Sequence, residues 1–246
     1  MRDTADARSL RAAALEARRA VVLGGGVIGL EAAASLRHLG LEVDVVEAAP
    51  RLMARNVPED MAARLAAIHG DAGVRLHLGR RAASLTPDPL GVTLDDGTEL
   101  LADVVVIGIG IVPETTLADA AGLGGPDGIP VDASYRTADD RVFAIGDVAS
   151  VDGAPRNESW AHAASSARAA ARAILGLEAE PPPIPWFWTT QHGHTLQVAG
   201  NPMAADRVAV GGTGASVYLR GDVPVGVAAL DAPRDFARLR RGLRAA

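Results

Sequence analysis

The chain has 246 residues, 48% of them hydrophobic and 22% charged, which predicts a globular protein with material for one large domain or two to three small ones. The net charge is −6 and all 24 basic residues are arginines, which excludes a Schiff-base or phosphate-loop lysine and argues against a nucleic-acid partner. The absence of cysteine excludes a disulfide, a thiolate metal site and a cysteine nucleophile within these residues.

The sequence carries no sign of export or of a membrane span. The first residues are polar and charged, and no apolar run is long enough to cross a bilayer. We therefore expect a soluble, cytoplasmic protein with no membrane partner.

His192 and His194 form the one close histidine pair, but they lack an acidic neighbour, so a loop or strand is favoured there over a metal site.

Strands and helices alternate along the first part of the chain. After an amphipathic helix over 3–20, an apolar strand at 20–23 leads into a helix over 28–39. A further helix is predicted to begin with Pro58 at its first position and to end near His69, and Asp95-Asp96-Gly97 is a hairpin turn signal. Three more strands are predicted at 42–47, 74–78 and 104–107. This order predicts a Rossmann-type α/β domain, which we place over 8–111.

The remaining residues predict two smaller parts. A strand over 142–145 and an alanine-rich helix over 159–175 fall within a segment that we place at 112–178. The prolines of 181–185 indicate a stiff linker. A small α+β domain over 183–246 is then predicted, with a closing helix at 233–243 and antiparallel strands at 195–199, 208–211, 216–220 and 223–229.

A glycine fingerprint lies between the first strand and the second helix. Gly24, Gly26 and Gly29 fit the G-x-G-x-x-G pattern, in which the glycines allow a tight turn, close approach of a pyrophosphate and close packing of the helix. Glu47 ends the next strand at about the spacing expected for a carboxylate that binds a ribose 2′-hydroxyl. Together these features predict dinucleotide binding, against the alternative of a glycine-rich turn without a ligand.

The type of nicotinamide cofactor is suggested by the same carboxylate. Glu47 would accept hydrogen bonds from the ribose hydroxyls of NAD and would repel the 2′-phosphate of NADP. Arg51 and Arg55 follow, however, and either is able to bind a 2′-phosphate, unless both lie on a solvated loop. We favour NADH.

Several segments resemble one family of flavoproteins. Residues 24–31 and 45–53 resemble the NADH domain of oxygenase-coupled ferredoxin reductases, of the putidaredoxin reductase and dioxygenase reductase type, within the pyridine nucleotide-disulphide oxidoreductase superfamily. Five further segments resemble the same family in the same order: 104–110, 137–147, 158–160, 185–188 and 232–236. The resemblance implies that 112–178 is the C-terminal part of an FAD-binding domain.

The resemblance also implies two sets of cofactor-binding residues and no catalytic acid, base or nucleophile. For NAD they are Gly24, Gly26, Val27, Ile28, Gly29, Glu31, Glu47, Gly108, Ile109 and Gly110. For FAD they are Arg2, Gly146, Asp147, Trp160 and Trp188. In the family the acid at Asp147 bonds the ribitol, and Glu31 lies near the nicotinamide. The alternatives are that Glu31 is an exposed helix residue and that the tryptophans are ordinary core or interface residues.

The function implied is an FAD-dependent NAD(P)H oxidoreductase that passes electrons from NADH to a [2Fe–2S] ferredoxin of an oxygenase system. Family members begin with a glycine fingerprint of their own for the ADP half of FAD, and this chain has only one fingerprint. We therefore expect the N-terminal half of the flavin domain to be missing here, with a separate chain as one source of it. A non-catalytic NAD-binding fragment stays open as an alternative, as does, less favoured, a disulfide-reductase-type flavoprotein.

Arginines are concentrated at the C-terminal end of this acidic chain. One hypothesis is that they steer an acidic ferredoxin toward the flavin, and the other is that they are solvated cations at a helix C-terminus. The five are Arg234, Arg238, Arg240, Arg241 and Arg244.

Overall fold

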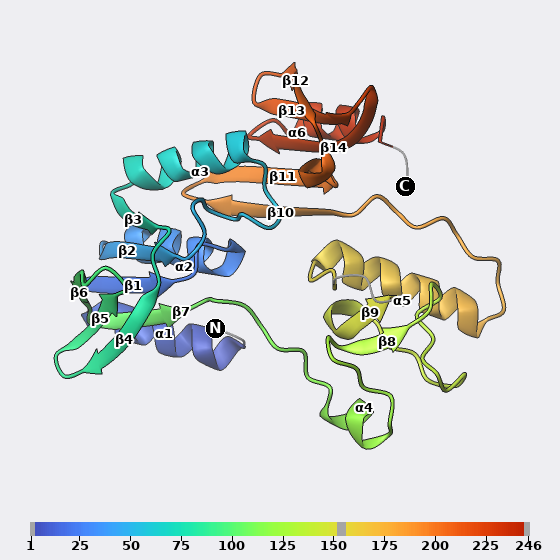
Figure 1. The fold of residues 1–246 in the computed structure, drawn as a ribbon, viewed down its shortest axis with the longest axis horizontal. Helices are drawn as coiled ribbons and strands as arrows, with labels where there is room; N and C mark the ends of the chain where they lie inside the picture. The colour runs from blue at the N-terminus through green and yellow to red at the C-terminus, as the bar shows by residue number, and fades with distance from the viewer. Residues whose placement is uncertain (1–2, 152–155, 244–246) are drawn as a thin grey trace.

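The computed structural model describes residues 3–151 and 156–243 and has three parts along the chain (Figure 1). The first contains a parallel sheet in the order β3-β2-β1-β7. Its elements are α1 (Thr4–Glu16), β1 (Arg19–Leu23), α2 (Val27–His38), β2 (Glu42–Glu47), α3 (Glu59–Asp71), β3 (Val74–Leu78) and β7 (Val104–Ile107). The predicted helices and strands of this part are confirmed, with two exceptions: the first helix ends at Glu16 rather than near residue 20, and Pro58 is the N-cap of α3, one residue before the helix.

The two faces of this sheet are covered differently. Val22, Val43 and Val45 pack in one core cluster with apolar residues of the helices. Val21 and Leu23 point to the other face, where they pack on a three-stranded antiparallel meander. Its strands are β4 (Ala82–Pro87), β5 (Leu90–Leu94) and β6 (Glu99–Leu101). The β5–β6 hairpin was predicted from its turn, whereas β4 was not, because every residue of β4 is exposed and carries no burial pattern.

The second part is a small lobe with little sheet. Its elements are α4 (Thr116–Ala120), β8 (Ile129–Val131), the 3-10 turn η1 (Gly146–Val148), β9 (Ala149–Val151) and α5 (Trp160–Ile174). The predicted helix is confirmed as α5, with Ser159 as its N-cap. The predicted strand over 142–145 is wrong: one isolated bridge joins Phe143 to Arg136, and Val142 and Ile145 are exposed. Within the described residues, no neighbouring strand continues that bridge into a ladder.

The third part is a five-stranded antiparallel sheet in the order β10-β11-β14-β13-β12 with one helix. The elements are β10 (Trp186–Gln191), β11 (His194–Gly200), the 3-10 turn η2 (Pro202–Ala204), β12 (Arg207–Gly212), β13 (Ala215–Arg220), β14 (Val223–Leu230) and α6 (Pro233–Arg240). The four predicted strands and the final helix are confirmed. β10 was not predicted, since Trp-Phe-Trp-Thr-Thr-Gln shows no apolar–polar alternation.

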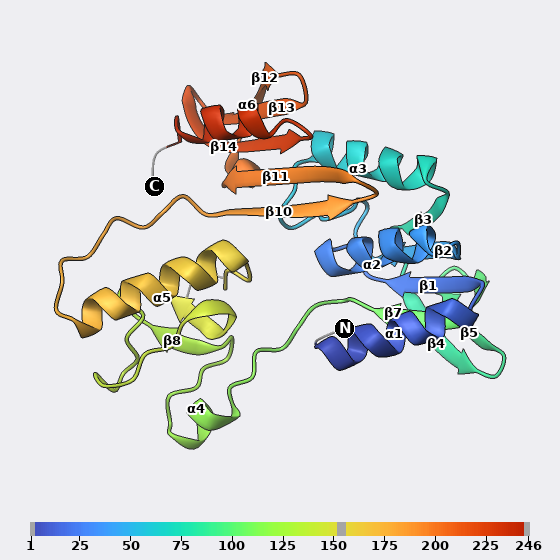
Figure 2. The same ribbon diagram turned by 180° about the vertical axis from the view of Figure 1, so that it is seen from behind.

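The third part packs directly on the first. Figures 1 and 2 show β10 and β11 beside α2 and α3 from opposite sides. Leu196, Val198 and Tyr218 belong to the same core cluster as Leu30, so the two parts share one hydrophobic core. The Tyr218 hydroxyl also donates to the Asp60 carboxylate at 2.8 Å. In the part of the chain that the structure describes, no helix is long and apolar enough to cross a membrane.

Candidate dinucleotide-binding site

The loop between β1 and α2 requires glycine at its first and last fingerprint positions. Gly24 has φ +108°, in a region that other residues rarely adopt. A Cβ on Gly24 would lie 2.3 Å from the carbonyl oxygen of Gly108, and a Cβ on Gly29 would lie 2.0 Å from that of Gly24. Both contacts are with backbone, which has no flexible end to move aside. The tight turn inferred from the sequence is therefore present.

The second glycine stretch, at the end of β7, lies against the first. The amide of Gly108 donates to the carbonyl of Leu23 at 2.7 Å, and a Cβ on Gly108 would be 3.4 Å from the Cα of Gly29. Gly110 has φ +126°, and Ile109 between them is 73% exposed. The two stretches meet at the carboxyl edge of a parallel sheet where the strand order reverses, which is where open α/β sheets bind ligands.

The N-terminal end of α2 opens onto this edge. Its N-cap, Gly26, offers no side-chain cap, and a Cβ added there would meet nothing within 4 Å. The first-turn amides of a helix, here beginning at Val27 and Ile28, have no intrahelical acceptor, and the helix dipole is positive at this end. Space above Gly26 together with these amides suits a phosphate group.

Glu47 lies beside the glycine loop and also organises it. Its Oε2 accepts from the amide of Gly25 at 2.6 Å, and its Oε1 accepts from the amide of Ala49 at 2.7 Å. Each carboxylate oxygen keeps a further acceptor site, which suits a ribose diol. Arg51, by contrast, donates to the carbonyls of Val57 and Ala54 and is therefore held by its own loop, which disfavours it as a phosphate ligand.

The residues expected to contact flavin lie on the second lobe and on β10. Gly146 has φ +69° and its amide donates to Ser166 Oγ at 2.9 Å, while Asp147 is exposed beside it. Trp160, at the first position of α5, is 70% exposed, and its ring centroid is 6.0 Å from that of Trp188. Trp160 thus begins the helix that packs on the turn carrying Asp147, and an exposed aromatic pair near an exposed acid fits a planar, partly polar ring system. Arg2 falls outside the described residues.

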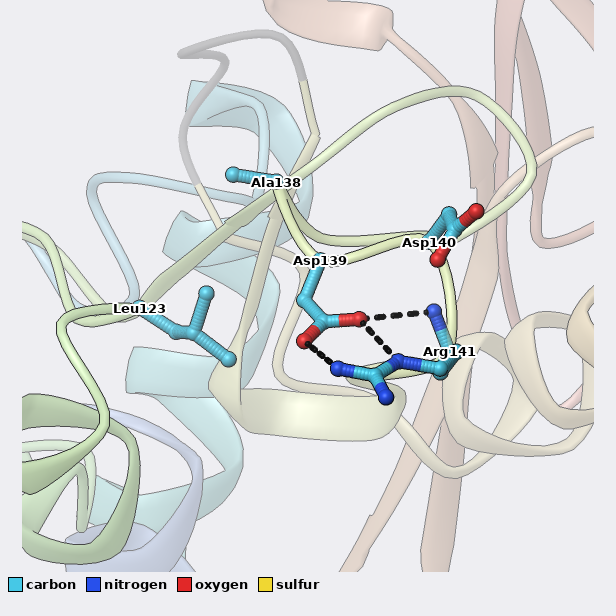
Figure 3. Close-up of a pocket in the computed structure, with 5 residues that line it drawn as sticks. All are labelled: Leu123, Ala138, Asp139, Asp140 and Arg141. Carbon is cyan, nitrogen blue, oxygen red and sulfur yellow. Dashed lines mark hydrogen bonds and ion pairs between the residues drawn. The ribbon is translucent and has the colours of Figure 1, made fainter.

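The start of the segment 137–147 is a tight turn held by its own hydrogen bonds: the amide of Thr137 donates to the carbonyl of Val142, and the amide of Val142 donates to the carbonyl of Asp139. Figure 3 shows an open hollow there, lined by Leu123 and by residues 138–141. Asp139 forms an ion pair with Arg141 at 2.9 Å and accepts from the amide of the same residue at 3.0 Å. Because these two charges neutralise each other, we place no ligand in this hollow.

Comparison with known proteins identifies the family. Residues 1–168 match the family described as pyridine nucleotide-disulphide oxidoreductase, and residues 186–246 match the reductase C-terminal domain. The chain belongs to the pyridine nucleotide-disulphide oxidoreductase family. Members of this family use FAD and NAD(P)H. The resemblance seen in the sequence is therefore confirmed, and so is the Rossmann-type α/β fold.

Curated relatives of the family include ferredoxin reductases. The chain is 38% identical over 229 residues to the ferredoxin–NAD(+) reductase component of the anthranilate 1,2-dioxygenase system of Burkholderia cepacia, covering 90% of this chain and 54% of the relative. It is also 38% identical over 255 residues to terpredoxin reductase of a Pseudomonas species, covering 98% and 62%. The chain thus spans between 54% and 62% of these curated relatives.

Solved structures agree with this placement. The ferredoxin reductase for the CYP199A2 system from Rhodopseudomonas palustris matches with a TM-score of 0.91 and 35% identity, covering 99% of this chain and 65% of that one. The covalent putidaredoxin reductase–putidaredoxin complex matches with a TM-score of 0.90 and 31% identity, covering 98% and 61%. A persulfide reductase from A. fulgidus, at 24% identity and a TM-score of 0.84, shares the fold.

The family's reductase C-terminal domain contributes residues that the sequence analysis missed. Thr189 and Gln191 of β10 are buried. They belong to one series of side chains joined by hydrogen bonds, which we call the Glu31 chain; its members, in bonding order, are Glu31, Thr189, Gln191, His69 and His192. For His69 a signal was available. It follows Met61 and Leu65 at four-residue spacing on the buried face of α3, where a histidine needs a polar partner.

Arg156 was also missed, although it anchors the turn at Gly146 and Asp147. Its side chain is only 8% exposed, donates to the carbonyl of Asp147 at 2.8 Å and forms ion pairs with Asp127 and Glu158. No local sequence pattern predicts that this arginine is buried and paired, because its partners Asp127, Asp147 and Glu158 are spread along the lobe.

The C-terminal arginines are less free than the steering hypothesis assumed. Arg238 is paired with Asp235 at 2.9 Å, and the guanidinium of Arg240 lies 4.7 Å from the ring centroid of Trp186. Arg234 is exposed on α6, Arg241 is exposed at the C-cap just after it, and Arg244 lies outside the described residues. The structure therefore narrows any steering surface to part of this helix.

Lowering the pH from about 7 to about 4.5 is expected to reduce the free energy of unfolding through His192. Burial first, then the neighbouring His69 and Arg37, lower the pKa of His192 from 6.5 to about 4. The unfolded chain takes up this proton near pH 6.5 and the folded protein does not, so stability present above that pH is lost as the pH falls toward 4. The side chain is partly exposed and screened, so we expect a loss of about 1 kcal/mol.

Urea unfolding of the wild type and of His192→Asn at both pH values measures this loss. The variant should lose less stability on acidification than the wild type. Equal losses in the two proteins would show that His192 does not carry the effect.

Proposed function

We propose that this chain forms the NADH-binding part and the adjoining flavin-facing part of an FAD-dependent NAD(P)H oxidoreductase that passes electrons to a [2Fe–2S] ferredoxin of an oxygenase system. The observation that carries the proposal is the backbone contact between the two glycine stretches, at Gly24 and Gly108, where the strand order reverses. A carboxylate at Glu47 completes the site at the end of the neighbouring strand. Membership of the family sets the class of chemistry.

Within this proposal each part of the chain has a role. Residues 8–111 bind NADH: the amides at the start of α2 hold the pyrophosphate, and Glu47 accepts from the ribose hydroxyls. Glu31, Ile109 and Gly110 lie on the nicotinamide side. When bound, the nicotinamide supplies a hydride, which the flavin accepts and passes on as electrons. Residues 183–246 form the reductase C-terminal domain.

The flavin contacts are assigned to 112–178 and to β10. Asp147 is placed at the ribitol, held by a turn that needs Gly146 at positive φ and that Arg156 fixes through the Asp147 carbonyl. Trp160 and Trp188 cover the ring system and shield it from water. Their exposure in the structure supports this role, because large exposed aromatic side chains commonly mark a binding surface.

The partner is inferred from the relatives. Two of them are named as ferredoxin or terpredoxin reductases, and one matching structure is a covalent complex of a reductase with putidaredoxin. We propose that this chain, with the remaining part of the flavin domain, serves the same kind of iron–sulfur partner. The supply of that part by a separate chain belongs to this proposal.

Cofactor titrations test the proposal. We expect the 246-residue chain to bind NADH, measured by enhanced nicotinamide fluorescence, and to retain FAD weakly on gel filtration. The reason is that Asp147 and Trp160 reach only the ribitol and the ring, not the ADP half. A polypeptide that supplies an ADP-binding half should raise FAD retention and allow NADH to bleach the flavin absorbance.

The outcomes separate the alternatives. A colourless protein that binds NADH and never gains flavin would identify a non-catalytic NAD-binding module. Stoichiometric FAD on the isolated chain would contradict the expected weak retention. Failure to bind NADH would contradict the proposed function itself.

A further inference from the structure

The Glu31 chain crosses the interface between the first and third parts of the molecule. Thr189 Oγ1 is 2.6 Å from Glu31 Oε1, and Gln191 Nε2 is 3.0 Å from Thr189 Oγ1. Gln191 Oε1 is 2.8 Å from His69 Nε2, and His69 Nδ1 is 3.2 Å from His192 Nε2. Glu31 belongs to α2 and His69 to α3, whereas the threonine and the glutamine belong to β10.

All four hydrogen bonds run in one direction. A carboxylate only accepts, so Thr189 must donate to Glu31, and its oxygen is then left to accept from the Gln191 amide. The Gln191 carbonyl must accept from Nε2–H of His69, and a neutral imidazole then has only Nδ1 with which to accept from His192. Every donor therefore points toward Glu31, and such series polarise one another in the same sense.

The middle of the hydrogen-bonded series is buried and lies where three parts of the molecule meet. Thr189 and Gln191 are each 1% exposed and His69 is fully buried, so water does not compete for these groups. Thr189 faces α2, while its neighbour Trp188 contacts Trp160 of the second lobe. One strand of the C-terminal domain, β10, thus contacts Glu31 of the first part through Thr189 and Trp160 of the second lobe through Trp188.

We propose that Thr189, supported by Gln191, is a positioning residue that fixes the Glu31 carboxylate for recognition of the nicotinamide half of NADH. The hydroxyl occupies Oε1 and holds the side chain against β10, which leaves Oε2 as the acceptor offered to a ligand N–H group such as a carboxamide. The C-terminal domain thereby sets selectivity in a site built on the Rossmann sheet. The Gln191 amide in the middle does not readily relay a proton, so the series acts through orientation.

This inference rests on the proposed function, because it takes Glu31 to face the nicotinamide. Two ligands separate the two claims. ADP-ribose carries the adenosine, pyrophosphate and second ribose of NADH but no nicotinamide. It therefore reports on the glycine loop and Glu47 alone, whereas NADH reports on Glu31 as well.

Binding of both ligands is measured by calorimetry in the full chain, for the wild type and four variants. Thr189→Val removes the donor at nearly constant shape and should weaken NADH binding about tenfold, while ADP-ribose binding changes less than about twofold. Thr189→Ser keeps the hydroxyl and should restore NADH binding. Gln191→Met breaks the next link and should weaken NADH binding by a smaller factor. Thr190→Val is the matched control, since Thr190 is exposed and bonds Thr195.

Each result decides the matter. Equal NADH affinity for Thr189→Val and the wild type would overturn the inference, as would equal weakening of both ligands, which indicates a purely structural role. If Thr189→Val melts far below the wild type, Gln191→Met and Thr189→Ser supply the comparison in its place. If the wild type binds ADP-ribose but shows no added affinity for NADH, the inference fails and the dinucleotide site stands. If it binds neither ligand, the proposed function fails with it.

Discussion

Gly29→Ala is expected to unfold the glycine loop and abolish NADH binding, with a loss of about 2–4 kcal/mol in the free energy of unfolding. The new methyl group would lie 2.0 Å from the carbonyl oxygen of Gly24 and 3.1 Å from its carbonyl carbon. To relieve this clash, the protein must move either the turn at Gly24, which also lies against Gly108, or the start of α2. Both movements disturb the amides that would hold a pyrophosphate.

Gly26→Ala provides the matched control, because its methyl group would enter open space. Apart from the adjoining residues of the loop, no described atom lies within 4 Å of that position, so stability should stay within about 0.5 kcal/mol of the wild type. NADH binding should nevertheless fall, since the methyl group occupies the approach of the pyrophosphate. Thermal melts and fluorescence titration of both variants give the answer. Unchanged NADH binding by Gly26→Ala would place the dinucleotide elsewhere.

The features that the sequence predicted well are those with short-range causes. The apolar run at 104–107, the apolar–polar alternation at 74–78 and the valine-rich segment at 42–47 are local patterns, and all three strands were located correctly. Gly24 and Gly29 of the fingerprint were recognisable because a tight turn and close helix packing exclude a Cβ at those two positions. Their contact with Gly108, 84 residues after Gly24, was not predicted, because it joins segments that are distant in the sequence.

The features that the sequence did not predict depend on distant partners. Glu31 and Thr189 are 158 residues apart, and nothing near either residue indicates their hydrogen bond. β10 carries polar residues on the face that packs against α2, because they find partners there. The apolar run at 142–145 looked like a strand, yet it has only one bridging residue.

Glu47 shows how far the sequence could predict the role of one residue of the candidate site. Its position at the end of β2 was predicted, and so was a role with ribose, which stays a proposal. Its hydrogen bonds to the amides of Gly25 and Ala49 were not predicted, because main-chain amides carry no sequence signal. The structure thus gives this carboxylate a role in shaping the loop in addition to its proposed role toward the ligand.

Glu47→Ala is expected to weaken NADH binding by roughly 1–3 kcal/mol, because ribose hydroxyls and two loop amides lose their acceptor together. It should also narrow the preference for NADH over NADPH, since the carboxylate that repels a 2′-phosphate is gone. A loss of about 1 kcal/mol in the free energy of unfolding should accompany both effects, because the amides of Gly25 and Ala49 lose a partly buried partner. Fluorescence titration with each nucleotide and chemical unfolding measure the three quantities.

Glu47→Gln separates the two roles of this side chain. Its amide oxygen still accepts one loop hydrogen bond, so the variant should keep more stability than Glu47→Ala, while the missing charge removes the repulsion of a 2′-phosphate. If repulsion sets the cofactor preference, both variants gain affinity for NADPH relative to NADH. If loop geometry sets it, Glu47→Gln keeps the wild-type preference. A wild type that binds NADPH more tightly than NADH would reverse the assignment and direct attention to the exposed Arg55, since Arg51 is already held by the carbonyls of Ala54 and Val57.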